Sequence, residues 1–240
     1  IITQNSSANV YSYSLETHAN FKAKVLEETM DGMLLKIDDN ELYVRLIGHF
    51  NAYNILAVYG VTKILRTPTE EVLVALSKLK PVNGRFECYR LKNGACAVID
   101  YAHTPDALEN VLETIEELRR GDQKLYVVCG CGGDRDRTKR PEMASVAVRF
   151  ATMAIFTSDN PRTENPEAIL DQMEAGKWEG SRTLRISDRA QAIHTAVMLA
   201  AAGDIILVAG KGHETYQIIG TEKRHFDDRE VLAEAFGIQN

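Results

Sequence analysis

The sequence has no uninterrupted apolar run that approaches the roughly 20 residues needed to span a membrane. It also has no excess of positive charge, because 28 lysine and arginine residues stand against 34 aspartate and glutamate residues, for a formal net charge of −6. The two signs are mixed along the chain, so membrane insertion and nucleic-acid binding are both disfavoured. The first residues carry neither the basic nor the apolar segment of a secretory signal, and we therefore expect a cytoplasmic protein.

Cysteine is scarce, with four residues in 240, and only one close pair occurs, the C-x-C of Cys129 and Cys131. A zinc site of the finger type needs a second close pair or a histidine at matching spacing, so we predict no metal site in this chain. We expect Cys88, Cys96, Cys129 and Cys131 to be buried or partly buried free thiols of a reducing compartment.

Two nucleotide-binding motifs are missing. No G-x-x-x-x-G-K-[ST] string occurs, and the nearest string, A-G-K-G-H-E at 209–214, lacks the four-residue spacer and the hydroxyl. The string G-C-G-G-D-R-D at 130–136 does not match G-x-G-x-x-G, and no acidic residue follows the first predicted strand of that region at the dinucleotide spacing. A dinucleotide oxidoreductase is therefore a distant alternative.

The chain is long enough for one or two hydrophobic cores, and its first part differs in pattern from the rest. In residues 1–45, short alternating runs separated by Asp, Asn and Gly predict antiparallel strands joined in hairpins. Helices are predicted at 51–65 and 68–79, the second opened by a capping box of Thr67 and Glu70 around Pro68. The string K-P-V-N-G-R-F breaks the periodicity, so we place a domain boundary between residues 1–82 and 83–240.

Beyond this boundary, apolar strands alternate with helices. Helices are predicted from Pro105, from about Pro141, from Pro166 and over 189–201, and strands at 96–101, 124–129, 153–157, 183–186 and 204–209. Strands that are apolar throughout and are separated by helices are typical of a parallel sheet covered on both faces. The second part is therefore predicted to be a Rossmann-like α/β domain, preceded by a partial α/β segment.

A polar string follows directly after each of four predicted strands. The strings are D-Y-A-H-T-P-D (100–106), G-C-G-G-D-R-D-R-T-K-R-P (130–141), S-D-N-P-R-T-E-N-P (158–166) and G-K-G-H-E (210–214). Any one of them alone is explained by a helix cap, a turn or a solvated charge run. Ligands of open α/β sheets bind at the carboxyl ends of the strands, so four such strings together predict one ligand site.

The side chains in these strings indicate the kind of ligand. Arg135 and Arg162 offer planar donor pairs for a carboxylate or phosphate, Asn160 can donate and accept, and Glu214 can receive an ammonium group. The glycines of these strings, at positions 130, 132, 133, 210 and 212, are expected to let the backbone approach a ligand closely. A site with both signs of charge suits a zwitterionic amino acid.

Together with G-H-F-N-A-Y-N-I-L-A-V (48–58) and N-G-R-F-E (83–87), these strings resemble the Mur ligase family, in the form that adds the third residue to UDP-N-acetylmuramoyl-L-alanyl-D-glutamate. The resemblance implies an ATP-dependent amide-forming ligase of peptidoglycan synthesis with three domains. ATP phosphorylates the substrate carboxylate, the incoming amino group attacks the acyl phosphate, and Mg²⁺ neutralises the charge. Residues 1–82 would be the end of the central ATPase domain, and residues 83–240 the C-terminal domain.

The resemblance also assigns roles to individual residues. It implies a nucleotide site at Asn51, Asn54, Arg85, Asp100 and His103, and a third-residue site at Arg135, Asp159, Asn160, Pro161, Arg162, Gly210 and Glu214. The D-N-P-R form of the motif is the one associated with meso-diaminopimelate rather than L-lysine. The phosphate loop and catalytic lysine of the family lie outside this chain, so we expect no catalytic residue in it, no activity of the chain alone and a monomeric parent enzyme. The alternative is a stand-alone amino-acid or nucleotide binding module.

Overall fold

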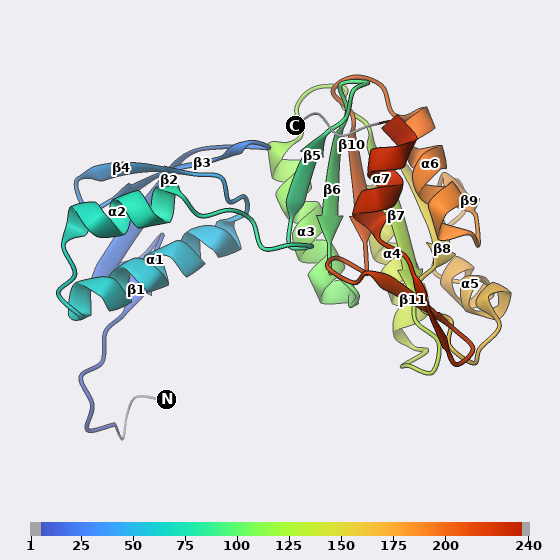
Figure 1. The fold of residues 1–240 in the computed structure, drawn as a ribbon, viewed down its shortest axis with the longest axis horizontal. Helices are drawn as coiled ribbons and strands as arrows, with labels where there is room; N and C mark the ends of the chain where they lie inside the picture. The colour runs from blue at the N-terminus through green and yellow to red at the C-terminus, as the bar shows by residue number, and fades with distance from the viewer. Residues whose placement is uncertain (1–5, 237–240) are drawn as a thin grey trace. The chain divides into compact units, whose positions relative to one another are not determined.

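The computed structural model describes residues 6–236, so the first five residues of the predicted strand region lie outside the described residues. The chain divides into two compact units, Ile1–Pro81 and Val82–Asn240 (Figure 1). Within the described residues, no helix has the length and apolar character needed to cross a membrane.

The first unit is built on a sheet with the strand order β1-β2-β3-β4. Its strands are β1 (Tyr13–Ser14), β2 (Phe21–Thr29), β3 (Gly32–Ile37) and β4 (Asn40–Val44). The prediction of antiparallel hairpins is confirmed for β2, β3 and β4. It is wrong for β1, which pairs with β2 in parallel. The Ser14 hydroxyl accepts hydrogen bonds from the backbone N–H groups of Glu16 and Thr17, and this wide polar loop replaces a tight hairpin turn.

Two helices cover this sheet, α1 (His49–Ile64) and α2 (Thr69–Ser77), both within two residues of their predicted ends. Their buried residues, such as Leu56 and Val72, pack with Leu35 of β3 in one apolar cluster. The predicted capping box is wrong. The helix starts one residue later than expected, so its N-cap is Pro68, whose ring offers no acceptor, and the hydroxyl of Thr69 accepts from the ammonium of Lys63 instead.

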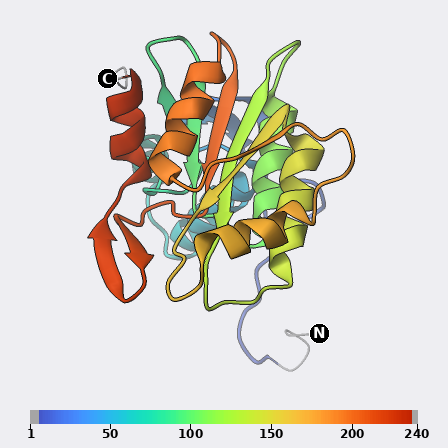
Figure 2. The ribbon, with the colours of Figure 1, turned by 90° about the vertical axis from the view of Figure 1, so that its right-hand side faces the viewer.

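The second unit contains a sheet with the strand order β5-β6-β10-β7-β8-β9. All its pairs are parallel except β5–β6. Its strands are β5 (Glu87–Arg90), β6 (Cys96–Asp100), β7 (Leu125–Cys131), β8 (Met153–Ser158), β9 (Thr183–Arg185) and β10 (Ile205–Ala209). The helices α3 (Pro105–Leu118), α4 (Lys139–Phe150) and α5 (Pro166–Glu174) lie on one face, and α6 (Arg189–Leu199) and α7 (Asp228–Phe236) on the other (Figure 2). The predicted α/β class, with a mostly parallel covered sheet, is confirmed.

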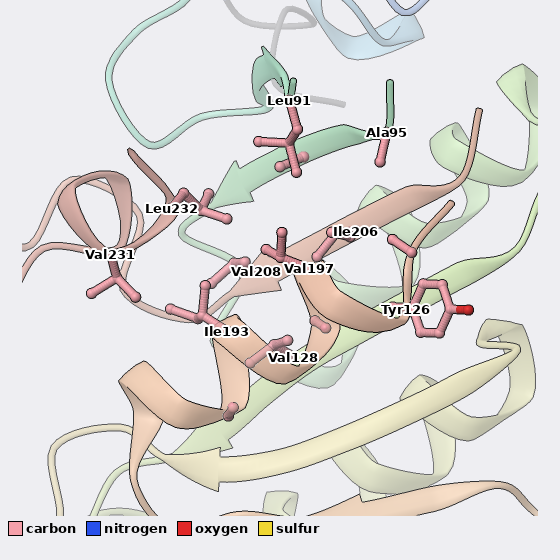
Figure 3. Packing of buried hydrophobic residues seen from close by; sticks show 14 of the residues in the cluster. Leu91, Ala95, Tyr126, Val128, Ile193, Val197, Ile206, Val208, Val231 and Leu232 are labelled. Carbon is pink, nitrogen blue, oxygen red and sulfur yellow. The ribbon is translucent and has the colours of Figure 1, made fainter. Parts of the chain in front are cut away.

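The core explains why these strands are apolar throughout. Every residue of β6, β7 and β10 is buried, because helices cover both faces of the sheet. On one face Val128 and Val208 pack against Ile193 of α6 and Leu232 of α7 (Figure 3). Cys129 and Cys131 of β7 are buried free thiols, as predicted.

The loops that follow β6 and β8 run directly into capped helix starts. Thr104 caps α3 by accepting from the N–H of Ala107, and Asn165 caps α5 by accepting from that of Glu167, each with proline in the first helical position. The helix α4 begins at Lys139, two residues before the predicted start. The elements that were not predicted are β5, α7 and the antiparallel hairpin of β11 (Tyr216–Ile219) and β12 (Glu222–His225).

Candidate functional site

A cavity of about 400 Å³ lies at the carboxyl ends of β6, β7, β8 and β10, where the four polar strings were expected to meet. We call it the sheet-edge cavity. It is lined by Tyr101, His103, Gly130, Cys131, Gly132, Arg135, Lys139, Asp159, Asn160, Arg162, Gly210, Glu214 and Tyr216. The structure thus brings together six of the seven residues predicted for the third-residue site, while Pro161 is not part of the lining. His103, predicted for the nucleotide, lines the same cavity.

The hairpin of β11 and β12, which was not predicted, holds the D-N-P-R loop (159–162) through hydrogen bonds to its backbone. The backbone N–H of Arg162 donates to the carbonyl of Ile218 at 3.0 Å, and the N–H of Gly220 donates to the carbonyl of Arg162 at 2.7 Å. Arg162 has a φ of 49°, a left-handed conformation that is unusual for arginine. These two bonds from the hairpin stabilise that conformation and so direct the side chain into the cavity.

The guanidinium of Arg162 is partly anchored. Its Nη1 donates to the carbonyl of Gly133 at 2.7 Å and to that of Asn160 at 3.5 Å, while Nε and Nη2 have no acceptor among residues 6–236. The bond to the neighbouring loop holds the guanidinium in place before a ligand binds. The two nitrogens that remain can still receive a carboxylate.

A buried lysine that sequence reasoning missed lies behind the cavity wall. Lys211 is fully buried, and its Nζ lies 3.4 Å from Oδ1 of Asp159, 3.2 Å from Oδ1 of Asn160 and 3.1 Å from Oε2 of Glu214. Asn160 in turn donates through Nδ2 to the same oxygen of Glu214 at 3.0 Å. Three predicted ligand residues, Asp159, Asn160 and Glu214, are therefore already joined to one internal ammonium group.

A second buried cation ties the two polar loops of β7 and β8 together. The guanidinium of Arg140, which is fully buried, donates to both carboxylate oxygens of Glu164 and to the carbonyl of Gly132. Glu164 also accepts from the backbone N–H of Asp134 at 2.6 Å. The charge run at 134–140 is thus in part a structural clamp rather than only a solvated surface.

We expect this clamp to weaken in acid. The hydrogen bonds from Arg140, followed by the bond from the Asp134 N–H, lower the pKa of Glu164 from 4.5 to about 2. Because the folded pKa is depressed, the stability that this carboxylate contributes is present above pH 4.5 and is lost as the pH falls towards about 2. Melting temperatures across this window should fall less steeply for Glu164→Gln than for the wild type. Parallel curves for the two proteins would contradict this assignment.

Two of the five glycines in the polar strings, Gly133 and Gly212, serve packing rather than ligand approach, which corrects the expectation for them. A Cβ on Gly133 would lie 1.9 Å from the carbonyl oxygen of Pro161, and one on Gly130 would lie 2.3 Å from that of Thr157. A Cβ on Gly212 would lie 2.7 Å from the carbonyl oxygen of Gly84. Of these five, Gly130, Gly132 and Gly210 line the cavity, so Gly130 serves both the packing of the sheet and the cavity surface.

Three of the residues predicted for the nucleotide belong to the second unit. Both carboxylate oxygens of Asp100 accept backbone N–H bonds, from Phe86 at 2.7 Å and Ala102 at 2.8 Å, and burial raises the pKa of this group. The guanidinium of Arg85 lies 5.0 Å from the ring centroid of Tyr101, and Nδ1 of His103 shares a hydrogen bond with the Tyr101 carbonyl oxygen. Asp100 is therefore a positioning group for the start of this loop.

The other two residues predicted for the nucleotide lie on α1 of the first unit. Asn51 donates through Nδ2 to the carbonyl of Ile47 at 2.7 Å, and Asn54 donates to Oδ1 of Asn51 at 3.4 Å. Both amides are partly used within the helix start, and each keeps capacity for a further hydrogen bond.

A scan against family models matches residues 84–212 to "Mur ligase, glutamate ligase domain", which is more than half of the chain. The chain belongs to the Mur ligase family. Among curated relatives, it is 53% identical over 238 residues to the UDP-N-acetylmuramoyl-L-alanyl-D-glutamate–2,6-diaminopimelate ligase of Phocaeicola vulgatus, a match that covers 98% of this chain and 49% of the relative. The ligase of the same name from Bacteroides fragilis is 52% identical, with 99% of this chain and 50% of the relative covered.

Solved structures agree with this assignment. A structure of a UDP-N-acetylmuramoyl-L-alanyl-D-glutamate–2,6-diaminopimelate ligase superimposes with a TM-score of 0.70 at 38% identity, covering 94% of this chain and 47% of that chain. The chain thus spans about half the length of the curated relatives it matches.

Proposed function

We propose that this chain is the amino-acid-binding portion of an ATP-dependent, amide-forming ligase of peptidoglycan synthesis that acts in the cytoplasm. The incoming amino acid is meso-diaminopimelate, and the acceptor is UDP-N-acetylmuramoyl-L-alanyl-D-glutamate. The observation that carries the proposal is the sheet-edge cavity, in which the cations Arg135 and Arg162 and the carboxylate of Glu214 line one enclosed volume. The names of the relatives support the particular substrate.

The chemistry of meso-diaminopimelate fits these side chains. The molecule carries an amino group and a carboxylate at each end, so its site needs donors for two carboxylates and an acceptor for at least one ammonium group. In the proposed arrangement Arg162 receives the distal carboxylate, Glu214 receives the distal ammonium, and Arg135 holds the carboxylate beside the attacking amine. That amine must be deprotonated to act as the nucleophile.

The residues that we propose for ATP binding are Asn51, Asn54, Arg85 and His103. Asp100 positions the loop that carries His103. Across residues 6–236, no group of three or more His, Cys, Asp or Glu side chains lies close enough to hold a metal ion. We propose, from the resemblance to the family, that the Mg²⁺ that accompanies ATP is held by other parts of a monomeric ligase.

A stand-alone binding module is the second candidate, favoured by the absence of a G-x-x-x-x-G-K-[ST] string from the 240 residues. The two candidates differ in what they do when the missing part is supplied. Joined to the additional half that the relatives possess, a ligase portion should form the amide bond, whereas a binding module should not.

The purified 240-residue chain is expected to bind meso-diaminopimelate but to release no phosphate with ATP, Mg²⁺, the amino acid and the UDP-linked dipeptide, because it has no phosphate loop. Calorimetry with the amino acid and a phosphate-release assay measure the two parts. Turnover by the chain alone would show that it holds a phosphate site of its own. Absence of meso-diaminopimelate binding would contradict the assignment of the cavity.

A further inference from the structure

We propose that Lys211 is a positioning residue of the sheet-edge cavity, which sets the direction of every hydrogen bond that Asn160 and Glu214 offer to an amino acid. This inference rests on the proposed function, since it concerns how the same cavity selects its ligand. Lys211 stands in the string G-K-G-H-E, between the two glycines, and is not part of the cavity lining.

The contacts of Lys211 exclude a direct role in ligand binding. A lysine ammonium has three N–H groups, and the Nζ of Lys211 has three acceptors within 3.4 Å, one each on Asp159, Asn160 and Glu214. The side chain is fully buried. With every donor used inside the protein, the ammonium acts through the groups it touches.

The first of these groups is the Asn160 amide. Its Oδ1 accepts from Nζ of Lys211 at 3.2 Å and from the backbone N–H of Ile218 at 2.9 Å, so both lone pairs of this oxygen are used. Rotating the amide by half a turn would place Nδ2 against these two donors. Lys211 therefore fixes the amide so that Nδ2 points towards Glu214, and the second N–H of Nδ2 has no acceptor among the described residues. Asn160 can thus only donate to a ligand.

The second group is the acidic pair of Asp159 and Glu214. Both carboxylates lie within 3.4 Å of the same ammonium, so they would repel each other without it. Lys211 and Asn160 both use Oε2 of Glu214, and Oε1 has no partner within residues 6–236. Lys211 and Asn160 therefore hold one oxygen of Glu214, and the other oxygen stays available to a ligand ammonium. The cavity thus combines a fixed donor on Asn160, a fixed acceptor on Glu214 and the guanidinium of Arg162. This set of groups matches a ligand that carries an ammonium group and a carboxylate on one carbon.

The test compares ligand affinities of the 240-residue chain, measured by calorimetry with meso-diaminopimelate and with L-lysine. Lys211→Met keeps the length and most of the volume of the side chain but removes its charge and donors. We expect it to weaken meso-diaminopimelate binding roughly 30-fold or more, because a buried partner of two carboxylates is lost. The affinity for L-lysine, which carries a net positive charge, should fall much less, since the uncompensated acidic pair attracts a cation. Merely looser packing would lower both affinities alike.

A charge-compensated variant separates electrostatics from packing. In Asp159→Asn combined with Lys211→Met, one negative charge is removed together with the positive one, and binding should recover to roughly tenfold weaker than wild type. Lys177→Met is the matched control, because Lys177 is a surface residue paired with Glu174, and its affinities should equal those of the wild type.

The outcomes distinguish this inference from the proposed function. A wild-type chain that binds no meso-diaminopimelate would overturn both. A wild type that binds, together with a Lys211→Met variant that binds equally well or loses both ligands in proportion, would overturn the role of Lys211 alone. If the melting temperature shows that Lys211→Met does not fold, the double variant decides the matter: wild-type affinity would overturn the proposal, and a loss of about tenfold would support it.

Discussion

Replacing Arg162 by alanine is expected to weaken the binding of meso-diaminopimelate roughly 30- to 1000-fold, the equivalent of about 2–4 kcal/mol for a charge-assisted pair in a partly desolvated site. Meso-diaminopimelate differs from lysine by one carboxylate on its distal carbon, and a selective site must present a fixed cationic group there. Arg162 lines the cavity, and its Nη1 is anchored to the carbonyls of Gly133 and Asn160. We expect its remaining nitrogens to meet that carboxylate with little loss of side-chain entropy.

The substitution is informative because it leaves the loop in place. The backbone bonds that join residue 162 to Ile218 and Gly220 do not involve the side chain, and alanine meets the same cost as arginine at a φ of 49°. Binding of L-lysine should therefore change little, so the gap between the two amino acids should narrow. Arg162→Lys should recover little, because a point charge does not reproduce the planar guanidinium.

Arg137 provides the matched control. It lies on the neighbouring loop, its side chain is 65% exposed, and it pairs with Glu164 without lining the cavity. Arg137→Ala should bind both amino acids as the wild type does. If calorimetry found equal affinities for Arg162→Ala and the wild type, the distal carboxylate would have to lie elsewhere.

Much of the second unit could be predicted from sequence because its determinants are local. The strands are continuous apolar runs, and the helices start at a capping residue followed by proline, as in Thr104–Pro105 and Asn165–Pro166. Topology then places the polar residues that follow each strand at one edge. The six lining residues that were predicted needed only this local pattern and the resemblance to a family.

Lys211 could not be predicted in the same way because its environment comes from distant parts of the chain. Its acceptors on Asp159 and Asn160 stand 52 and 51 residues away, and nothing in G-K-G-H-E distinguishes a buried ammonium from one that contacts a ligand. The hairpin β11–β12 was missed for a related reason. Every residue of β12 is exposed, so the strand has no apolar pattern, and bonds from β11 to the D-N-P-R loop tie the hairpin to the unit.

The ion pair of Arg189 and Asp228 has no local signature either, and it leads to the largest stability effect we expect. Both side chains are fully buried. Arg189 donates through Nε to Oδ1 of Asp228 at 2.8 Å and through Nη2 to Oδ2 at 2.7 Å, and Nη2 also donates to the carbonyl of Ala209 at 3.1 Å. This pair joins the starts of α6 and α7 to the end of β10, directly before Gly210 of the cavity.

Asp228→Ala should lower the free energy of unfolding of the second unit by about 3–5 kcal/mol, because it leaves a buried guanidinium without a counter-charge. The cost should be at the upper end of that range. Nη1 of Arg189 already has no hydrogen-bond partner among the described residues, so the loss of Asp228 would leave the buried guanidinium with the carbonyl of Ala209 as its one acceptor there. Urea unfolding, followed by a probe in the second unit, measures the change and also reports whether that unit still unfolds in one step.

Two further variants decide whether charge or packing is responsible for the stability lost in Asp228→Ala. Glu222→Ala breaks the exposed pair with Arg224, whose side chains are 68% and 61% exposed, and should cost less than about 1 kcal/mol. Arg189→Met combined with Asp228→Leu removes both charges and keeps apolar volume, so it should recover most of the stability lost by Asp228→Ala. If the double variant were as unstable as the single one, the hydrogen bond to Ala209 and the shape of the pair would be what stabilises this junction.

If Asp228→Ala itself cost less than about 1 kcal/mol, the guanidinium would have to reach water on losing its partner, and the junction at the cavity edge would be far more open than its full burial indicates.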